Sequence, residues 1–280
     1  MDRTEKLKIF NYSNGQFLYK EDICSIEEPL EIRLTYGAIS DRKTESVAIT
    51  MRTPGYDEEL ALGFLLNEGI IHADTELLNV KKSVAIKNII NPNIITISLT
   101  PDFYPDLIKL RRNFYTTSSC GICGKSSIDA LMEACPTEIP LGEGNFTIES
   151  IKAMPDIMRQ YQSDFEHTGG IHASALFDEA GGLVVLREDV GRHNALDKIT
   201  GWMYLNKILH TTKNFMLMLS GRVSYELVQK AAMSGIRLIA AVGAPSSLAV
   251  RTAAALNITL IGFLRGENFN LYTHRERLII

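Results

Sequence analysis

The chain has few cysteines and no strong excess of charge of either sign. Its 280 residues include four cysteines and one tryptophan, and the formal net charge is -4. Four unevenly spaced cysteines are too few for a disulfide framework, which suits a reducing compartment. Without a basic excess there is no general attraction to nucleic acid or to an anionic membrane. Any anionic ligand must therefore be held by local groups.

Long apolar segments are absent as well. No run of 18 or more apolar residues occurs, and the stretch MDRTEKLKIFNYSNG lacks the apolar core of a signal peptide. We therefore expect a soluble, cytoplasmic protein without a membrane or nucleic-acid partner. The length and the 45% hydrophobic content predict about two domains with adequate cores.

The first part of the chain predicts a small α+β domain. β-rich runs and turn residues alternate here, with one helical segment after the TPGYD turn. The expected strands are 31–36, 46–52, 80–87 and 93–100, and the expected helix is 58–71. We place the end of this domain at residue 112, so the predicted domains are 1–112 and 113–280.

The second part predicts an α/β domain. Helices are expected over 125–135 and 147–165, and two strands follow, HASALFD and GLVVLRE. From residue 193 to residue 265, helices and strands alternate strictly. Such alternation is typical of a largely parallel sheet that helices cover on both faces.

Unusual polar residues fall where the strands of this domain end and its helices begin. In open α/β sheets this edge binds ligands. Helix N-termini and arginines there suit phosphates, although serine, asparagine and glycine are also ordinary caps and turn residues. Four segments on one edge favour a pocket: 191–194, 220–222, 244–247 and 263–268. The candidate ligand-binding residues outside the last segment are Arg192, His193, Ser220, Gly221 and Arg222, and His193 could instead cap its helix.

The motif TTSSCGICGK holds Cys120 and Cys123 in a C-x-x-C spacing. Structural zinc normally needs a second ligand pair, and none is present with suitable spacing. A zinc deaminase has H-x-E ahead of P-C-x-x-C, whereas here Ser119 precedes the motif and HAS follows it without the glutamate. A thioredoxin-like site normally follows an early strand of a compact domain, which this motif does not.

A thiol that accepts and passes on a group is the remaining interpretation of the motif. Both cysteines lie just ahead of the helix predicted over 125–135, whose N-terminal dipole and Lys125 would favour a thiolate. Gly121 and Gly124 leave the sulfurs little covered. An exposed reactive sulfur suits transfer between partners. The spacing alone does not choose among metal, redox and carrier chemistry.

Several long motifs in fixed order closely resemble the formate dehydrogenase accessory sulfurtransferase (FdhD) family. They are TSSCGICGK, TGGIHASAL, EDVGRHNALDK, SGRVSYELVQKAA, APSSLAV and GFLRGENFNLYT. The resemblance extends from about residue 30 to about residue 274 and is densest after residue 116. The first 25 residues and the tail HRERLII carry none of it.

The resemblance implies a specific function. Members of the family take persulfide sulfur from a cysteine desulfurase and deliver it to the Mo-bis-molybdopterin guanine dinucleotide (Mo-bis-MGD) cofactor, which formate dehydrogenase needs. The persulfide-carrying cysteine of the family falls on Cys120, with Cys123 as the second thiol. The cofactor-binding stretch falls on Phe263, Leu264, Arg265, Gly266, Glu267 and Asn268, and a guanine nucleotide is expected to stand in for the cofactor.

The resemblance also implies a fold and an assembly. The larger domain is expected to be a three-layer α/β/α domain like that of cytidine deaminases, and the protein is expected to be a homodimer. No permanent metal is expected. Two other functions are compatible with the residues: a non-catalytic chaperone of the molybdenum cofactor and a C-x-x-C thiol oxidoreductase.

Overall fold

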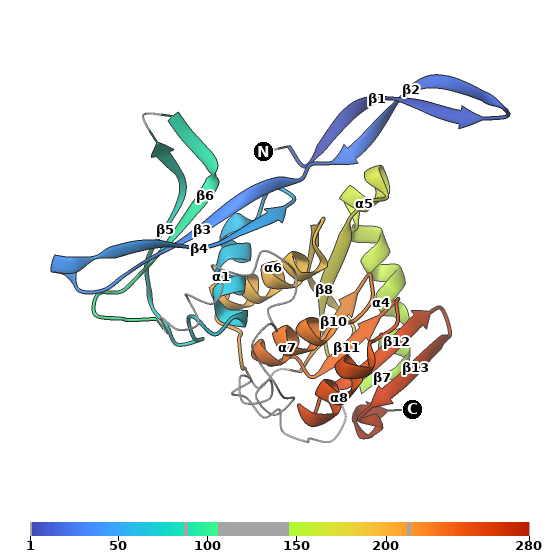
Figure 1. Cartoon of the computed structure of the whole chain (residues 1–280). Coiled ribbons are helices and arrows are strands. Elements are labelled where there is room, and N and C mark those ends of the chain that lie inside the picture. The colour runs from blue at the N-terminus through green and yellow to red at the C-terminus, as the bar shows by residue number, and fades with distance from the viewer. Residues whose placement is uncertain (1, 87–88, 106–145, 212–213, 280) are drawn as a thin grey trace.

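The computed structural model describes residues 2–86, 89–105, 146–211 and 214–279. They form a projecting hairpin, a four-stranded sheet with one helix, and a six-stranded sheet between layers of helices (Figure 1). The helix predicted over 125–135 and the domain boundary predicted at residue 112 lie outside the described residues. The division into two domains therefore stays a prediction.

The N-terminal hairpin consists of β1 (Thr4–Ser13) and β2 (Gln16–Ser25), which pair along their whole length. Asn14 and Gly15 form its turn with φ angles of 51° and 81°, the conformation for which Asn-Gly is preferred. The hairpin projects from the rest of the protein, as the blue ribbon of Figure 1 shows. At its base, Nε of Arg3 donates a hydrogen bond to Asp164 at 2.6 Å. This hairpin was not predicted from the sequence.

The four-stranded sheet has the order β4-β3-β6-β5. Its strands are β3 (Glu28–Tyr36), β4 (Lys43–Arg52), β5 (Leu77–Ile86) and β6 (Ile89–Leu99), and a short 3-10 helix, η1 (Ile39–Asp41), joins β3 to β4. Helix α1 (Asp57–Asn67) contributes buried leucines to the core of this sheet. The four strands and the helix expected between residues 31 and 100 are thereby confirmed, with shifted ends.

The six-stranded sheet has the order β13-β12-β11-β10-β8-β9. Its strands are β8 (His172–Asp178), β9 (Leu183–Asp189), β10 (Phe215–Leu219), β11 (Leu238–Ala241), β12 (Thr259–Arg265) and β13 (Asn268–Thr273). Only β10, β11 and β12 pair in parallel, and the other three pairings are antiparallel. The prediction of a largely parallel sheet was therefore wrong at both edges. Short turns join β8 to β9 and β12 to β13, and such turns connect only antiparallel strands.

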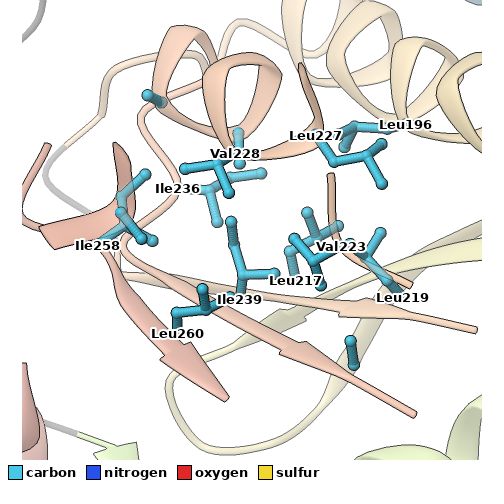
Figure 2. Close-up of a cluster of buried hydrophobic side chains, with 14 of the residues drawn as sticks. Leu196, Leu217, Leu219, Val223, Leu227, Val228, Ile236, Ile239, Ile258 and Leu260 are labelled. Carbon is cyan, nitrogen blue, oxygen red and sulfur yellow. The ribbon is translucent and has the colours of Figure 1, made fainter. Parts of the chain in front are cut away.

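Helices cover both faces of this sheet. On one face lie α6 (Arg192–Leu205), α7 (Tyr225–Met233) and α8 (Ser247–Ala255), whose apolar residues pack on alternate residues of β10, β11 and β12. Figure 2 shows Leu227 and Val228 of α7 above Leu217, Ile239 and Leu260 of the strands. The other face packs against α4 (Ile148–Tyr161). The three α/β/α layers follow from the alternation of apolar side chains along each central strand.

Smaller elements complete the described chain. The single helix predicted over 147–165 is two helices, because the chain leaves helical geometry at Gln162 before α5 (Ser163–Thr168). The C-terminal η2 (Arg275–Arg277) leads into β14 (Leu278–Ile279), which pairs with β7 (Phe146–Thr147). None of the helices in the described ranges combines the length and apolar character needed to cross a bilayer.

Helices α1 and α6 join the two sheets by crossing at two glycines. An ideal Cβ atom on Gly63 would lie 1.8 Å from the backbone carbonyl oxygen of Asp197, and one on Gly201 would lie 1.9 Å from that of Glu59. The two backbones are therefore in direct contact, which only glycine at both positions permits. Asn67 of α1 adds a hydrogen bond of 2.7 Å to the carboxylate of Asp197.

Candidate functional site

Two loops run side by side at the carboxyl ends of β10 and β11. The Gly243 N–H donates to the Gly221 carbonyl at 3.2 Å, the Val223 N–H donates to the Ala244 carbonyl at 3.1 Å, and the Ser246 N–H donates to the Val223 carbonyl at 3.0 Å. The Val223 side chain is buried in the core under α7, which fixes the loop to the sheet. The parallel pairing of β10 and β11 thus continues into the loops that precede α7 and α8.

A hollow of about 360 Å³ lies between these loops and the start of α6. Helices α6, α7 and α8 all begin at its edge, with Gly191, Ser224 and Ser246 as their N-cap residues. It is lined by Arg192, Arg222, Val223, Ser224, Ala244, Pro245 and Ser246. Three of the four segments predicted to share one rim, those around 192, 222 and 245, are therefore brought together.

The hollow is cationic. Arg192 and Arg222 are its charged lining residues. The Nε atom of Arg192 is buried and has no hydrogen-bond partner among the described residues. A buried donor without a partner is costly, and an anionic oxygen would satisfy it. The N-terminal ends of three helices add partial positive charge at the same place.

His193 lies beside the hollow and does not cap its helix. Its Nε2 is 3.3 Å from Oγ of Ser224 and 3.3 Å from a carboxylate oxygen of Glu226, and the Ser224 hydroxyl donates to Glu226 at 2.9 Å. The cap position of α6 is taken by Gly191, without a side-chain hydrogen bond. The hydrogen bond from His193 holds the pKa of the Glu226 carboxyl below its usual value.

His172, the first residue of β8, lies beside Gly221 of the loop that follows β10. An ideal Cβ atom on Gly221 would lie 3.3 Å from Nδ1 of His172, so the absence of a side chain at Gly221 lets the ring pack against the loop. Burial, reinforced by the charges of Arg192 and His193, lowers the pKa of His172. The imidazole is therefore held neutral near the cationic hollow.

The stretch from Phe263 to Asn268 forms the end of β12, a tight turn and the start of β13. The Phe263 N–H donates to the Gly243 carbonyl at 3.2 Å, which places this residue beside the β11–α8 loop. Leu264 is buried, whereas Arg265, Gly266, Glu267 and Asn268 are exposed. Glu267 forms an ion pair with Lys152 of α4. None of these residues is among those that line the hollow.

The remaining predicted site residues have different positions. Cys120 and Cys123 lie outside the described residues. Ser220 fixes the loop rather than facing the hollow, because its hydroxyl accepts a hydrogen bond from the Ala173 N–H at 2.8 Å. Ser224 and Glu226 were not among the sequence candidates, although their position just after a buried strand could have suggested them. The described residues contain no cluster of three or more His, Cys, Asp or Glu side chains that could hold a metal.

Comparison with known proteins shows likeness along the whole chain. Residues 26–279 match the model of the FdhD/NarQ family. A protein of Mycobacterium tuberculosis named sulfur carrier protein FdhD is 40% identical over 98% of both chains. Proteins of that name from Streptomyces coelicolor and Thermoplasma volcanium are 42% and 43% identical, over 99% and 94% of this chain and 96% and 92% of their own.

A solved structure shares the fold. The crystal structure of a protein described as a formate dehydrogenase accessory protein, from Desulfotalea psychrophila, superposes with a TM-score of 0.72. The superposition covers 99% of this chain and 100% of the other, at 22% sequence identity. At that identity the likeness concerns the mixed α/β fold alone.

Proposed function

The chain belongs to the FdhD/NarQ family, and from this premise we propose that it is a sulfur carrier that serves formate dehydrogenase. In this proposal a cysteine desulfurase supplies persulfide sulfur, Cys120 carries it, and the Mo-bis-MGD cofactor of formate dehydrogenase receives it. The observation that carries the proposal is the 40% identity over 98% of both chains with a protein named sulfur carrier protein.

The first step is a transfer of sulfane sulfur between two cysteines. The Cys120 thiolate attacks the outer sulfur of the donor persulfide, whose S–S bond breaks. Cys120 then carries a persulfide, and the donor cysteine leaves as a thiolate that takes up a proton. The number of S–S bonds is unchanged, so this step needs no oxidant or reductant.

Two routes deliver the sulfur afterwards. In the direct route the outer sulfur would pass to the metal of the substrate cofactor as the S–S bond breaks and the Cys120 thiolate leaves. The sulfane sulfur would become a sulfide ligand by taking two electrons from a reduced metal centre. In the other route the Cys123 thiolate attacks the sulfur of Cys120, which releases hydrosulfide and leaves a Cys120–Cys123 disulfide. That disulfide must then be reduced by an external thiol before the next cycle. Only the second route requires Cys123.

The hollow suits the phosphate groups of such a cargo. Arg192 and Arg222 line it, and the buried Nε of Arg192 lacks a partner among the described residues. Guanidinium groups and helix N-termini are the usual partners of phosphates in proteins. In the proposal these two arginines hold the pyrophosphate, and the exposed Arg265 at the end of β12 contributes a further contact.

Sulfur loading tests the carrier role. The full chain is incubated with a cysteine desulfurase and cysteine, and mass spectrometry follows the peptide that contains Cys120. We expect a gain of one sulfur in the wild type and in a Cys24→Ala control, whose cysteine is exposed on β2, and none in Cys120→Ala. Loading that persists in Cys120→Ala contradicts the assignment of the carrier.

Cargo binding and the competing functions are tested separately. We expect Arg265→Ala to weaken binding of a guanine nucleotide, and an unchanged affinity would remove Arg265 from the site. Stoichiometric zinc in the purified protein would favour the cofactor chaperone over the carrier. Rapid reduction of insulin disulfides would favour the thiol oxidoreductase.

A homodimer is also part of the proposal, and the N-terminal hairpin offers a surface for it. Four aromatic side chains gather on one face of the hairpin, with Phe10 beside Tyr19 and Tyr12 beside Phe17, and each is at least 60% exposed. At about 200 Å² per aromatic side chain, about two thirds of it exposed, the eight side chains of two such faces would bury about 1,000 Å² in total, the lower limit of a stable interface. A lone two-stranded hairpin is also marginally stable unless something covers it.

The dimer is tested by sedimentation of two variants. Replacing Phe10, Tyr12, Phe17 and Tyr19 by serine should shift the wild-type dimer toward the monomer. Leu7→Ser with Leu18→Ser changes the opposite face of the same hairpin and should leave the dimer intact. A dimer that survives the first set of substitutions excludes this interface.

A further inference from the structure

Gly262 of β12 lies between two rings. An ideal Cβ atom on Gly262 would lie 2.8 Å from Cδ of Pro245 and 3.1 Å from a ring carbon of Tyr272. The pyrrolidine ring of Pro245 and the edge of the Tyr272 ring therefore occupy the space that a side chain at this position would need. We call these two residues the Pro245–Tyr272 surface. Because Pro245 also lines the cationic hollow, this surface continues the hollow toward β13.

Aromatic area stays exposed at this surface. Tyr272 is 37% exposed, and Phe263, which follows Gly262 in β12, is 43% exposed. Phe263 also has a φ of 55°, within the register shift between Gly262 and Arg265. A non-glycine residue in the left-handed region carries local strain, which concentrates at binding sites. The strand is thus distorted directly after Gly262, where Phe263 hydrogen-bonds to the β11–α8 loop that contributes to the hollow.

A nucleotide matches the two halves of this region. Its phosphates need cationic donors, which Arg192 and Arg222 supply in the hollow. Its base needs a flat apolar surface. An aromatic ring provides one and can stack on any base, because every base has a π-face. Arg192 and Arg222 share the hollow with Pro245, and Pro245 and Tyr272 both lie against Gly262, so this region offers both requirements.

We propose that Tyr272, supported by Pro245, stacks against a guanine base of the bound dinucleotide while Arg192 and Arg222 contact its phosphates. This inference rests on the proposed function for the identity of the cargo. It assigns Tyr272, which lies beyond the stretch 263–268, to the recognition of the base. It also explains why residue 262 is a glycine, because any side chain there would displace the tyrosine ring or Pro245.

Binding titrations of the full chain separate the two halves of the site. Guanosine diphosphate and inorganic pyrophosphate are the probes, and the variants are Tyr272→Ala, Tyr272→Phe and Tyr161→Ala. We expect Tyr272→Ala to weaken the diphosphate by about 5- to 150-fold, the range for loss of one stacked base, and to leave pyrophosphate unchanged. Tyr272→Phe keeps the ring and should bind as the wild type does. Tyr161 is an exposed tyrosine at the end of α4, on the opposite face of the sheet, and serves as the matched control.

Two results would overturn the inference. One is an unchanged diphosphate affinity in Tyr272→Ala, or no diphosphate binding by the wild type. The other is an equal loss of diphosphate and pyrophosphate affinity, because that points to a collapsed loop rather than a lost stack. Sulfur loading of Cys120, measured on the same samples, reports on the carrier proposal independently. Normal loading with an unaffected diphosphate titration would remove the base site and keep the carrier.

Discussion

The crossing of α1 and α6 makes Gly201→Ala a severe substitution. An ideal Cβ atom on Gly201 would lie 1.9 Å from the Glu59 carbonyl oxygen and 2.7 Å from the Glu59 Cα atom, and real Cβ atoms essentially never approach within 3.0 Å. Both atoms belong to the backbone of Glu59 and not to a flexible side chain, so the two helices must separate by about 1 Å. The separation would stretch the hydrogen bonds from Asn67 to Asp197 and Thr200, which are 2.7 Å and 3.1 Å long.

The expected loss of stability follows from three contributions. Alanine in place of a helical glycine favours folding by about 1 kcal/mol. Forced overpacking of a tight contact costs about 1–3 kcal/mol, and weakened buried polar contacts cost about 1–3 kcal/mol more. The two unfavourable contributions together exceed the favourable one, and we expect Gly201→Ala to lower the free energy of unfolding by about 3 kcal/mol.

Urea unfolding followed by the fluorescence of Trp202 measures this loss. Trp202 is the sole tryptophan of the chain and directly follows Gly201 in α6, so its emission reports on the crossing. Gly170→Ala is the matched control, because its φ is not positive and the nearest atom to an added Cβ is 3.8 Å away. The control should unfold within about 0.5 kcal/mol of the wild type. A Gly201→Ala midpoint at or above that of the wild type would refute the reasoning.

Three further outcomes concern buried charges near the hollow. Lys198 and Asp189 form a fully buried ion pair of 2.7 Å, and Lys198→Ala should lower the urea midpoint by the equivalent of about 3–5 kcal/mol because the buried carboxylate loses its cationic partner. The His193 hydrogen bond lowers the pKa of Glu226, so the ionised Glu226 stabilises the folded protein above about pH 4.3. This stability is lost as the pH falls through the lower pKa of the folded state. Glu226→Gln should therefore reduce the fall in the free energy of unfolding below about pH 4.3. Burial lowers the pKa of His172, so as the pH falls the imidazole is protonated in the unfolded chain before it is protonated in the folded protein. Stability should therefore fall as the pH drops below about 6.5. His172→Gln should reduce the difference between the urea midpoints at pH 7 and pH 5.

Local patterns predict the central part of the six-stranded sheet well. Strand β12 has the predicted ends, and α8 begins after Ser246, whose hydroxyl accepts the Ala249 N–H as a cap residue should. Strand β13 was missed because its apolar residues are few and only half-buried. The β1–β2 hairpin was missed for a related reason: most of its residues are exposed on both faces, so no apolar alternation marks it. The Asn14-Gly15 turn was the available signal.

The site could be predicted only in part. The sequence predicts at which edge of the sheet the polar segments meet, because the carboxyl ends of neighbouring parallel strands share one edge, and three of the four segments do meet there. It does not indicate that Tyr272 and Pro245 both lie against Gly262, since the position of Tyr272 depends on the bulged pairing of β12 and β13. Nor does it show that His193 contacts Glu226 of another helix rather than its own backbone.

The hydrogen bond that Ser224 donates to Glu226 bears on where the proposed cargo would bind. Serine at an N-cap position normally accepts a hydrogen bond from the first turn, and loss of that bond costs about 1 kcal/mol. Ser224 occupies this position in α7, yet its hydroxyl makes no such bond and donates to Glu226 instead. Ser224 therefore leaves the start of α7 without a cap from its hydroxyl, and the buried Nε of Arg192 lacks a hydrogen-bond partner among the described residues at the same hollow. A phosphate there would satisfy both sets of donors at once, which is why we place the pyrophosphate between α6 and α7.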